Sequence, residues 1–89
     1  MNPTGREVKL LKALADGTRL KIVMLLANGE RCACEFVPLT GKAQPTVSLH
    51  LKVLSGAGII AARREGKSII YRINDRRALS IMKLLAARR

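Results

Sequence analysis

The side chains best suited to chemistry in this sequence are two thiols that stand one residue apart. Cys32 and Cys34 are the only cysteines among the 89 residues, and the stretch around them reads ERCACEF. Thiolates bind soft, thiophilic ions, and they also exchange with disulfides. The pair is therefore a candidate ion site or redox pair, and the alternative is two inert small side chains.

The surroundings of the two thiols favour their reactive form. Arg31 precedes them and a helix is expected to begin close by, and both a positive charge and a helix N-terminus lower the pKa of a thiol. Residues two apart point to nearly opposite sides of a regular helix, whereas in an extended chain they share a face. One ion that bound both sulfurs would therefore disfavour regular helix at residues 32–34.

Other kinds of chemistry find few suitable residues. His50 is the only imidazole in the chain, and no glycine-rich phosphate loop is present, so no set of nucleophile, base and carboxylate can be assembled and an enzyme is not expected. A tetrahedral zinc site needs four donors, which two Cys and one His of a single chain cannot supply. No cofactor is predicted to be required.

The charge is strongly positive and unevenly distributed. The formal net charge is +11, with seven basic and four acidic residues through Gln44 but ten basic and two acidic residues after it. Such an excess attracts polyanions, because neutralised phosphates release counterions. Since the chain has one Phe, one Tyr and no Trp, it offers hardly any stacking platforms for single strands. Double-stranded DNA is the favoured partner, and a basic surface without a partner is the alternative.

The sequence carries no sign of membrane insertion or export. No apolar run approaches the roughly 20 residues of a membrane span, and MNPTGREVK lacks the apolar core of a signal peptide. We therefore expect a cytoplasmic protein without a membrane partner. Thiols are kept reduced in that compartment, so a structural disulfide is not expected.

Hydrophobic spacing predicts five helices and one β-hairpin. Apolar residues at helical spacing mark an amphipathic helix over residues 6–16 and a nearly all-apolar, buried helix over 17–29. A short helix ending at Gly41 follows, and then a helix that starts at Pro45. Two β-branched runs around Glu65-Gly66-Lys67 indicate a hairpin, and a capped helix follows from Asp75. The apolar stripes are predicted to be Val8, Leu11, Leu14 and Ala15 in the first helix, Val47, Leu51 and Leu54 in the fourth, and Leu79, Met82 and Leu85 in the last.

This order of elements predicts a mainly α fold with a small β-hairpin, a winged helix-turn-helix. We expect one domain over residues 1–89, with the helix-turn-helix at about 32–56, the wing at about 59–73 and a C-terminal helix at about 75–87. A chain this short buries only about 60–65% of its unfolded surface, so we expect a homodimer. An unspecific helical bundle with a hairpin is the alternative fold.

The fold places two groups of side chains against DNA. The outward face of the fourth helix should enter the major groove, and the basic hairpin should reach phosphates or a minor groove. His50 borders the apolar stripe of that helix, which favours a partly buried structural role over a DNA contact. The predicted DNA-binding residues are Gln44, Thr46, Ser48, Leu49 and Lys52 on the helix, and Arg63, Arg64 and Lys67 on the wing.

Four segments together resemble the arsenic-repressor (ArsR/SmtB) family of prokaryotic transcription factors. They read LADGTRLKIVMLL, CACEF, AQPTVSLHLKVLSGAGII and RREGKSIIYRI. The resemblance implies a homodimeric winged-helix repressor that pairs through its first and last helices and releases operator DNA when an ion binds. It also implies that Cys32 and Cys34 bind trivalent arsenic or antimony, because a Cys-x-Cys at this place does so in the family.

The sequence departs from the family pattern at several positions. Val37 follows Phe36 where related sites often have a third cysteine nearby, and Arg31 replaces an apolar residue. The family's zinc site on the last helix requires Asp and His residues, and that helix offers only Asp75. A third sulfur for arsenic would have to come from a small thiol or a partner chain.

The sequence thus predicts a DNA-binding repressor that releases its operator when As(III), Sb(III) or another thiophilic ion binds Cys32 and Cys34. A redox-responsive winged-helix regulator and a non-sensing architectural DNA-binding protein are the alternatives. A protein whose last helix binds a partner chain is a third possibility.

Overall fold

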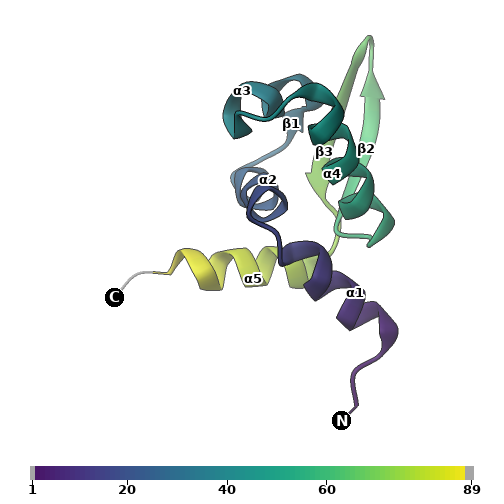
Figure 1. Cartoon of the computed structure of the whole chain (residues 1–89), viewed down its shortest axis with the longest axis vertical. Coiled ribbons are helices and arrows are strands. Elements are labelled where there is room, and N and C mark those ends of the chain that lie inside the picture. Colours follow the sequence, from purple (N-terminus) through teal and green to yellow (C-terminus); the bar gives the residue numbers. More distant parts are fainter. Residues whose placement is uncertain (1, 88–89) are drawn as a thin grey trace.

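The computed structural model describes residues 2–87 and confirms a mainly helical chain with a small antiparallel sheet (Figure 1). The wing strands project at one end, and the first and last helices lie toward the other. The elements are α1 Gly5–Leu14, α2 Gly17–Ala27, β1 Arg31–Cys32, a 3-10 turn at Ala33–Glu35, α3 Phe36–Thr40, α4 Gln44–Gly56, β2 Ile60–Glu65, β3 Ser68–Ile73 and α5 Arg76–Ala86.

Acidic side chains accept backbone N–H groups at the start of three helices. The Asp16 carboxylate accepts the Arg19 backbone N–H at 3.0 Å at the start of α2. At the start of α5, the Asp75 carboxylate accepts the backbone N–H of Arg77 at 2.8 Å. In the first turn of α1, the Glu7 carboxylate accepts the backbone N–H of Thr4, the residue before the helix, at 2.7 Å. These bonds satisfy donors that a helix N-terminus otherwise leaves unpaired.

The sheet has three strands in the order β1-β3-β2. β2 and β3 form the predicted antiparallel hairpin, with Ile60 opposite Ile73 and Glu65 opposite Ser68. Gly66 takes a φ of 60° in the turn, a conformation that glycine adopts without strain. β1 was not predicted, because a strand of two residues is too short to show an alternating pattern.

The core forms around α2, as the sequence predicted. Ile22 and Val23 of α2 are fully buried, and α2 packs against α1, α3, α4, α5 and β3. All three residues of the predicted α4 stripe are buried as well. The other large side chains that are fully buried are Phe36, Leu54, Ile59, Met82 and Val47.

Two predicted helix faces are wrong in part. In α1 the buried residues are Leu10, Ala13 and Leu14, whereas Val8 and Leu11 are 41% and 57% exposed. In α5 Met82 is buried as predicted, but Leu85 is 55% exposed. Each helix carries apolar residues on more than one face, so periodicity alone did not decide which face packs inside a single chain.

The helix predicted to start near the cysteines begins later, at Phe36. Cys32 ends β1, and residues 33–35 form the 3-10 turn, so no α-helix exists at residues 32–34 for an ion to disrupt. Among residues 2–87, no helix combines the length and hydropathy that a bilayer crossing requires.

Candidate DNA-binding surface and thiol pair

The two cysteines are joined to each other. Cys32 and Cys34 form a disulfide, and their Cα atoms lie 5.2 Å apart. This contradicts the expectation that no disulfide would form. The reason is local: a backbone that passes from a strand into a 3-10 turn places both sulfurs on the same side, which an α-helix would not do.

Glu35 holds the segment around the disulfide in place. One carboxylate oxygen accepts the backbone N–H of Cys32 at 2.8 Å, and the other accepts a bond from the Arg31 guanidinium at 3.1 Å. Arg31 also donates to the carbonyl of Leu25 at 3.3 Å. The guanidinium of Arg31 therefore forms an ion pair with Glu35.

Sequence reasoning did not single out Glu35, although a signal for it existed. An acidic residue three positions after a capping residue is the pattern of a capping box. Here Cys32 takes the capping position: its sulfur accepts the backbone N–H of Cys34 at 3.2 Å while Glu35 accepts its N–H.

The thiol pair is connected to the wing by backbone pairing and to the core by an aromatic ring. Cys32 lies opposite Ile70, and Arg31 opposite Tyr71, in the antiparallel pairing of β1 with β3. Phe36, two residues after Cys34, is fully buried and meets the ring of Tyr71 edge-on, with ring centroids 6.4 Å apart. A change of backbone shape at residues 32–34 would therefore act on both β3 and the core.

An ion pair forms a further link between this segment and the wing. The Arg63 guanidinium lies 2.7 Å from the carboxylate of Glu30, just before β1, and 2.6 Å from that of Glu65. The hydrogen bond from Arg63 lowers the pKa of Glu30. Two hydrogen bonds raise the pKa of Arg63: the bond to Glu30 has the larger effect and the bond to Glu65 the smaller one.

These contacts distinguish the three predicted cations of the wing. All three are exposed, but Arg63 shares its charge with two carboxylates. Arg64 and Lys67 form no ion pair among residues 2–87. The charges of Arg64 and Lys67 are thus available for a phosphate. A phosphate at Arg63 would instead lie close to the carboxylates of Glu30 and Glu65 and be repelled by them.

The structure exposes all the predicted residues of α4, which are spread around the broad side of the helix that faces away from the core. Leu49 is 65% exposed, and the amide nitrogen of Gln44 donates to the hydroxyl of Ser48 at 3.1 Å. An exposed set of amide, hydroxyl and ammonium groups on a helix has the donors and acceptors that base edges require. The residues on this side are Gln44, Thr46, Ser48, Leu49 and Lys52.

His50 belongs to α4, but its side chain contacts residues at the start of α2. Its side chain is 17% exposed, and Nδ1 lies 3.3 Å from a guanidinium nitrogen of Arg19 and 3.9 Å from the Asp16 carboxylate. The hydrogen bond from the backbone N–H of Arg19 lowers the pKa of Asp16, and the charge of Arg19 contributes in the same direction. This position supports the structural role for His50.

The donor set around the disulfide is small. Within residues 2–87 no group of three or more His, Cys, Asp or Glu side chains could hold one metal ion. After reduction, Cys32 and Cys34 would offer two sulfurs, while the carboxylate of Glu35 is already bonded to Arg31 and to the backbone. A third donor would come from outside the chain.

Comparison with known sequences places this chain among regulatory proteins. Residues 16–62 match the family described as "Bacterial regulatory protein, arsR family". An uncharacterized HTH-type transcriptional regulator of Methanocaldococcus jannaschii is 44% identical over 86 residues, which cover 96% of this chain and 97% of that protein. The arsenical resistance operon repressor of Escherichia coli is 41% identical over 68 residues, which cover 75% of this chain but 58% of the repressor.

Solved structures show the same architecture. The solution structure of a homodimeric winged helix-turn-helix DNA-binding domain from Mycobacterium bovis, described as a possible ArsR-family regulator, matches with a TM-score of 0.82 and 38% sequence identity. The match covers 90% of this chain and 74% of that one. The winged helix-turn-helix predicted from the order of elements is thereby confirmed.

Proposed function

The chain belongs to the arsR family of bacterial regulatory proteins, and from that premise we propose that it is a transcriptional repressor whose hold on operator DNA is controlled at Cys32 and Cys34. Its relatives are transcriptional regulators and not enzymes. The observation that carries the proposal is the pairing of Cys32 with β3, which joins the thiol pair to the wing.

In the proposed complex, α4 enters the major groove and the wing contacts the backbone. The net charge of +11 supports this arrangement, because each neutralised phosphate releases counterions and strengthens binding. Base contacts come from the exposed face of α4, and phosphate contacts from Arg64 and Lys67. Arg63 has a positioning role between the Glu30 segment and the wing.

The proposed effector is As(III), Sb(III) or another thiophilic ion bound by the reduced pair. Each thiol replaces one hydroxyl of arsenous acid and releases one water, which leaves a third position for an external donor. Two free thiols can take a range of separations, whereas an ion held between the two sulfurs fixes one separation. Residues 32–34 therefore change shape, and β1 transmits the change to β3 while Phe36 transmits it to the core. The coupling needed to release DNA is about 1–3 kcal/mol.

A redox-responsive regulator is the second candidate, and the disulfide favours it. In that case the two-electron oxidation of the thiols, with loss of two protons to an oxidant, is itself the signal. Both candidates use the same β1–β3 connection, and they differ only in whether an ion or an oxidant changes the separation of the sulfurs.

We further propose that the repressor is a homodimer paired through α1 and α5. Val8 and Leu11 on α1 and Leu84 and Leu85 on α5 are apolar and between 41% and 77% exposed. Apolar side chains grouped on two helices are typical of an interface between subunits. The homodimeric state of the M. bovis domain supports this arrangement.

Fluorescence anisotropy of a labelled palindromic fragment from the region upstream of the gene tests the proposal. The fully reduced protein should bind tightly and with sequence preference, and arsenite or antimonite should release it. Release by an oxidant alone, with no effect of arsenite on the reduced protein, would select the redox candidate. Binding without sequence preference, unaffected by ions or oxidant, would contradict both and indicate an architectural protein.

A further inference from the structure

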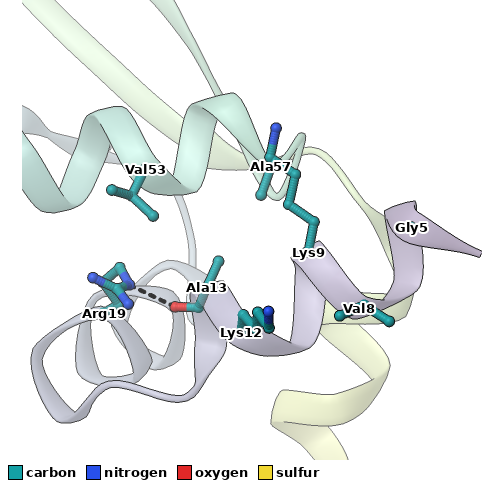
Figure 2. A pocket seen from close by; sticks show the side chains of 8 residues that line it. All are labelled: Gly5, Val8, Lys9, Lys12, Ala13, Arg19, Val53 and Ala57. Atoms are coloured by element: carbon teal, nitrogen blue, oxygen red, sulfur yellow. Dashed lines mark hydrogen bonds between the residues drawn. The ribbon is translucent and has the colours of Figure 1, made fainter.

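A pocket of about 510 Å³ lies between α1 and the C-terminal part of α4 (Figure 2). Its walls are apolar: Val8 and Ala13 come from α1, and Val53 and Ala57 from α4 and the residue that follows it. Figure 2 shows Val53 pointing from α4 toward α1, and Lys9 extending from α1 toward Ala57. The volume falls within the range of about 300–1,000 Å³ that is usual for small-molecule sites.

Three basic side chains surround these apolar walls. They are Lys9, Lys12 and Arg19, and none of them forms an ion pair among residues 2–87. The Arg63, Arg31 and Arg77 guanidinium groups, by contrast, all meet carboxylates. The pocket therefore combines apolar walls with three cations that form no ion pair among residues 2–87.

Arg19 is held in a fixed position at this pocket. Its Nε donates to the carbonyl of Ala13 at 2.7 Å, and Nη1 lies 3.3 Å from Nδ1 of His50. Its remaining guanidinium nitrogen, Nη2, has no hydrogen-bond partner within residues 2–87. A guanidinium that is already oriented loses less freedom when it binds an anion than a mobile side chain does.

We propose that this pocket binds a small amphipathic anion, a carboxylate carried on an alkyl or aryl body. The body packs against Val8, Val53 and Ala57, and the carboxylate lies among the cations. Hydrogen bonds to a charged group are among the stronger polar contacts in proteins. The inference concerns binding alone and does not depend on the proposed repressor function.

A second copy of the chain is a poorer occupant than an anion. The three cations of the pocket need a negative charge beside them, and the apolar residues that the proposed dimer would bury carry none. Most of the exposed apolar residues available for pairing, Leu11, Leu84 and Leu85, are also not among the residues that line the pocket.

Titration of the ¹⁵N-labelled full-length protein with decanoate, below its micelle concentration, tests the proposal. Amide shifts should concentrate at residues 8–13, 19 and 53–57, and they should saturate. Decan-1-ol, which has the same chain without the charge, should bind about tenfold more weakly, and decyltrimethylammonium should bind less than the alcohol. Shifts centred on α5, or equal binding of all three probes, would overturn the proposal.

Charge-removing variants provide the second measurement. The double variant Lys9→Gln/Lys12→Gln should weaken decanoate binding by about tenfold or more. Lys21→Gln/Lys83→Gln removes the same charge from exposed positions on α2 and α5, and it should leave binding unchanged. If both variants lost decanoate affinity equally, the effect would be one of general charge. If the amide shifts followed dissociation of the dimer, a second copy would occupy the pocket. Either result overturns the proposal.

Discussion

Arg63 and Arg64 are neighbours on β2, but their surroundings differ. Arg63 is bonded to Glu30 and Glu65, whereas Arg64 forms no ion pair among residues 2–87. Two arginines that look equivalent in the sequence therefore divide into one that positions the wing and one that is available to DNA.

This difference predicts unequal effects of two matched substitutions. In the proposed homodimer, Arg64→Gln should reduce the slope of log K against log salt concentration by about two, because each protomer loses one phosphate contact. Arg63→Gln should change that slope less, because the two carboxylates already compensate its charge. Anisotropy titrations at several salt concentrations measure both slopes. Equal decreases would contradict the assignment of Arg63 to a positioning role.

The Glu30–Arg63 pair also predicts a dependence of stability on pH. The bond lowers the pKa of Glu30 below its ordinary value of 4.5. A carboxyl group whose pKa is lower in the folded state adds stability above its unfolded pKa, and the contribution is lost as the pH falls through the folded pKa. The wild type should therefore melt at a higher temperature than Glu30→Gln at pH 7, and the difference should shrink below about pH 4. Melting curves from pH 7 to pH 3 test this, and a difference that did not change with pH would contradict it.

At the residue scale, the sequence identified the reactive side chains but did not predict the residues that form hydrogen bonds or ion pairs with them. The Cys-x-Cys spacing identified the thiol pair, and the helical wheel placed His50 at the edge of a buried stripe. Glu30 was missed because its partner Arg63 is distant in the chain, and no local pattern pairs two such charges. Glu35 could have been found from its capping-box spacing.

At the scale of elements, Phe36 connects the thiol segment to the core. It is the first residue of α3, it is fully buried, and its ring contacts Tyr71 of β3. Its loss should therefore affect stability and the response to effectors together.

The expected cost of this loss can be stated. Phe36→Ala should lower the free energy of unfolding by about 3–5 kcal/mol, from the transfer of the ring and the cavity that it leaves. Leu39→Ala, on the same helix but 37% exposed, should cost clearly less. Urea unfolding followed by circular dichroism measures both. A small effect of Phe36→Ala, similar to that of Leu39→Ala, would contradict the connecting role of the ring.

Most of the elements could be predicted, and those that could not were short or irregular. Long runs with helical spacing located α1, α2, α4 and α5, and the β-branched runs around Gly66 located the hairpin. β1 and the 3-10 turn were not predicted, because segments of two or three residues are too short to show a periodic pattern. That failure changed the proposed mechanism: an ion cannot unwind a helix that begins only at Phe36, so the coupling is proposed to act through β1 and the core.

At the scale of the whole molecule, the exposed apolar residues of α1 and α5 are the feature that a single chain leaves unexplained. The sequence could show that both helices are amphipathic, but the choice between two apolar faces depends on neighbours in space. Leu11 and Leu85 were assigned to the intrachain core for that reason, and the structure shows them exposed. A partner chain would cover them.

The proposed dimer predicts different outcomes for two equally simple substitutions. Leu84→Asp places a charge on a 77% exposed residue of α5 and should convert the dimer to monomer. Leu49→Asp does the same on the 65% exposed face of α4, and it should leave the dimer intact while weakening DNA binding. Light scattering coupled to size-exclusion chromatography reports the mass of each variant. A dimeric Leu84→Asp protein would show that subunits pair elsewhere.

The most direct test of thiol control is a comparison of DNA release by the reduced wild type and by the Cys32→Ser/Cys34→Ser variant. Both should bind the same operator fragment with similar affinity, because neither sulfur lies on the proposed DNA-binding face. Arsenite should weaken the binding of the wild type by about 5–150-fold and should not affect the variant. Equal responses of the two proteins to arsenite, or to an oxidant, would contradict control at the thiol pair.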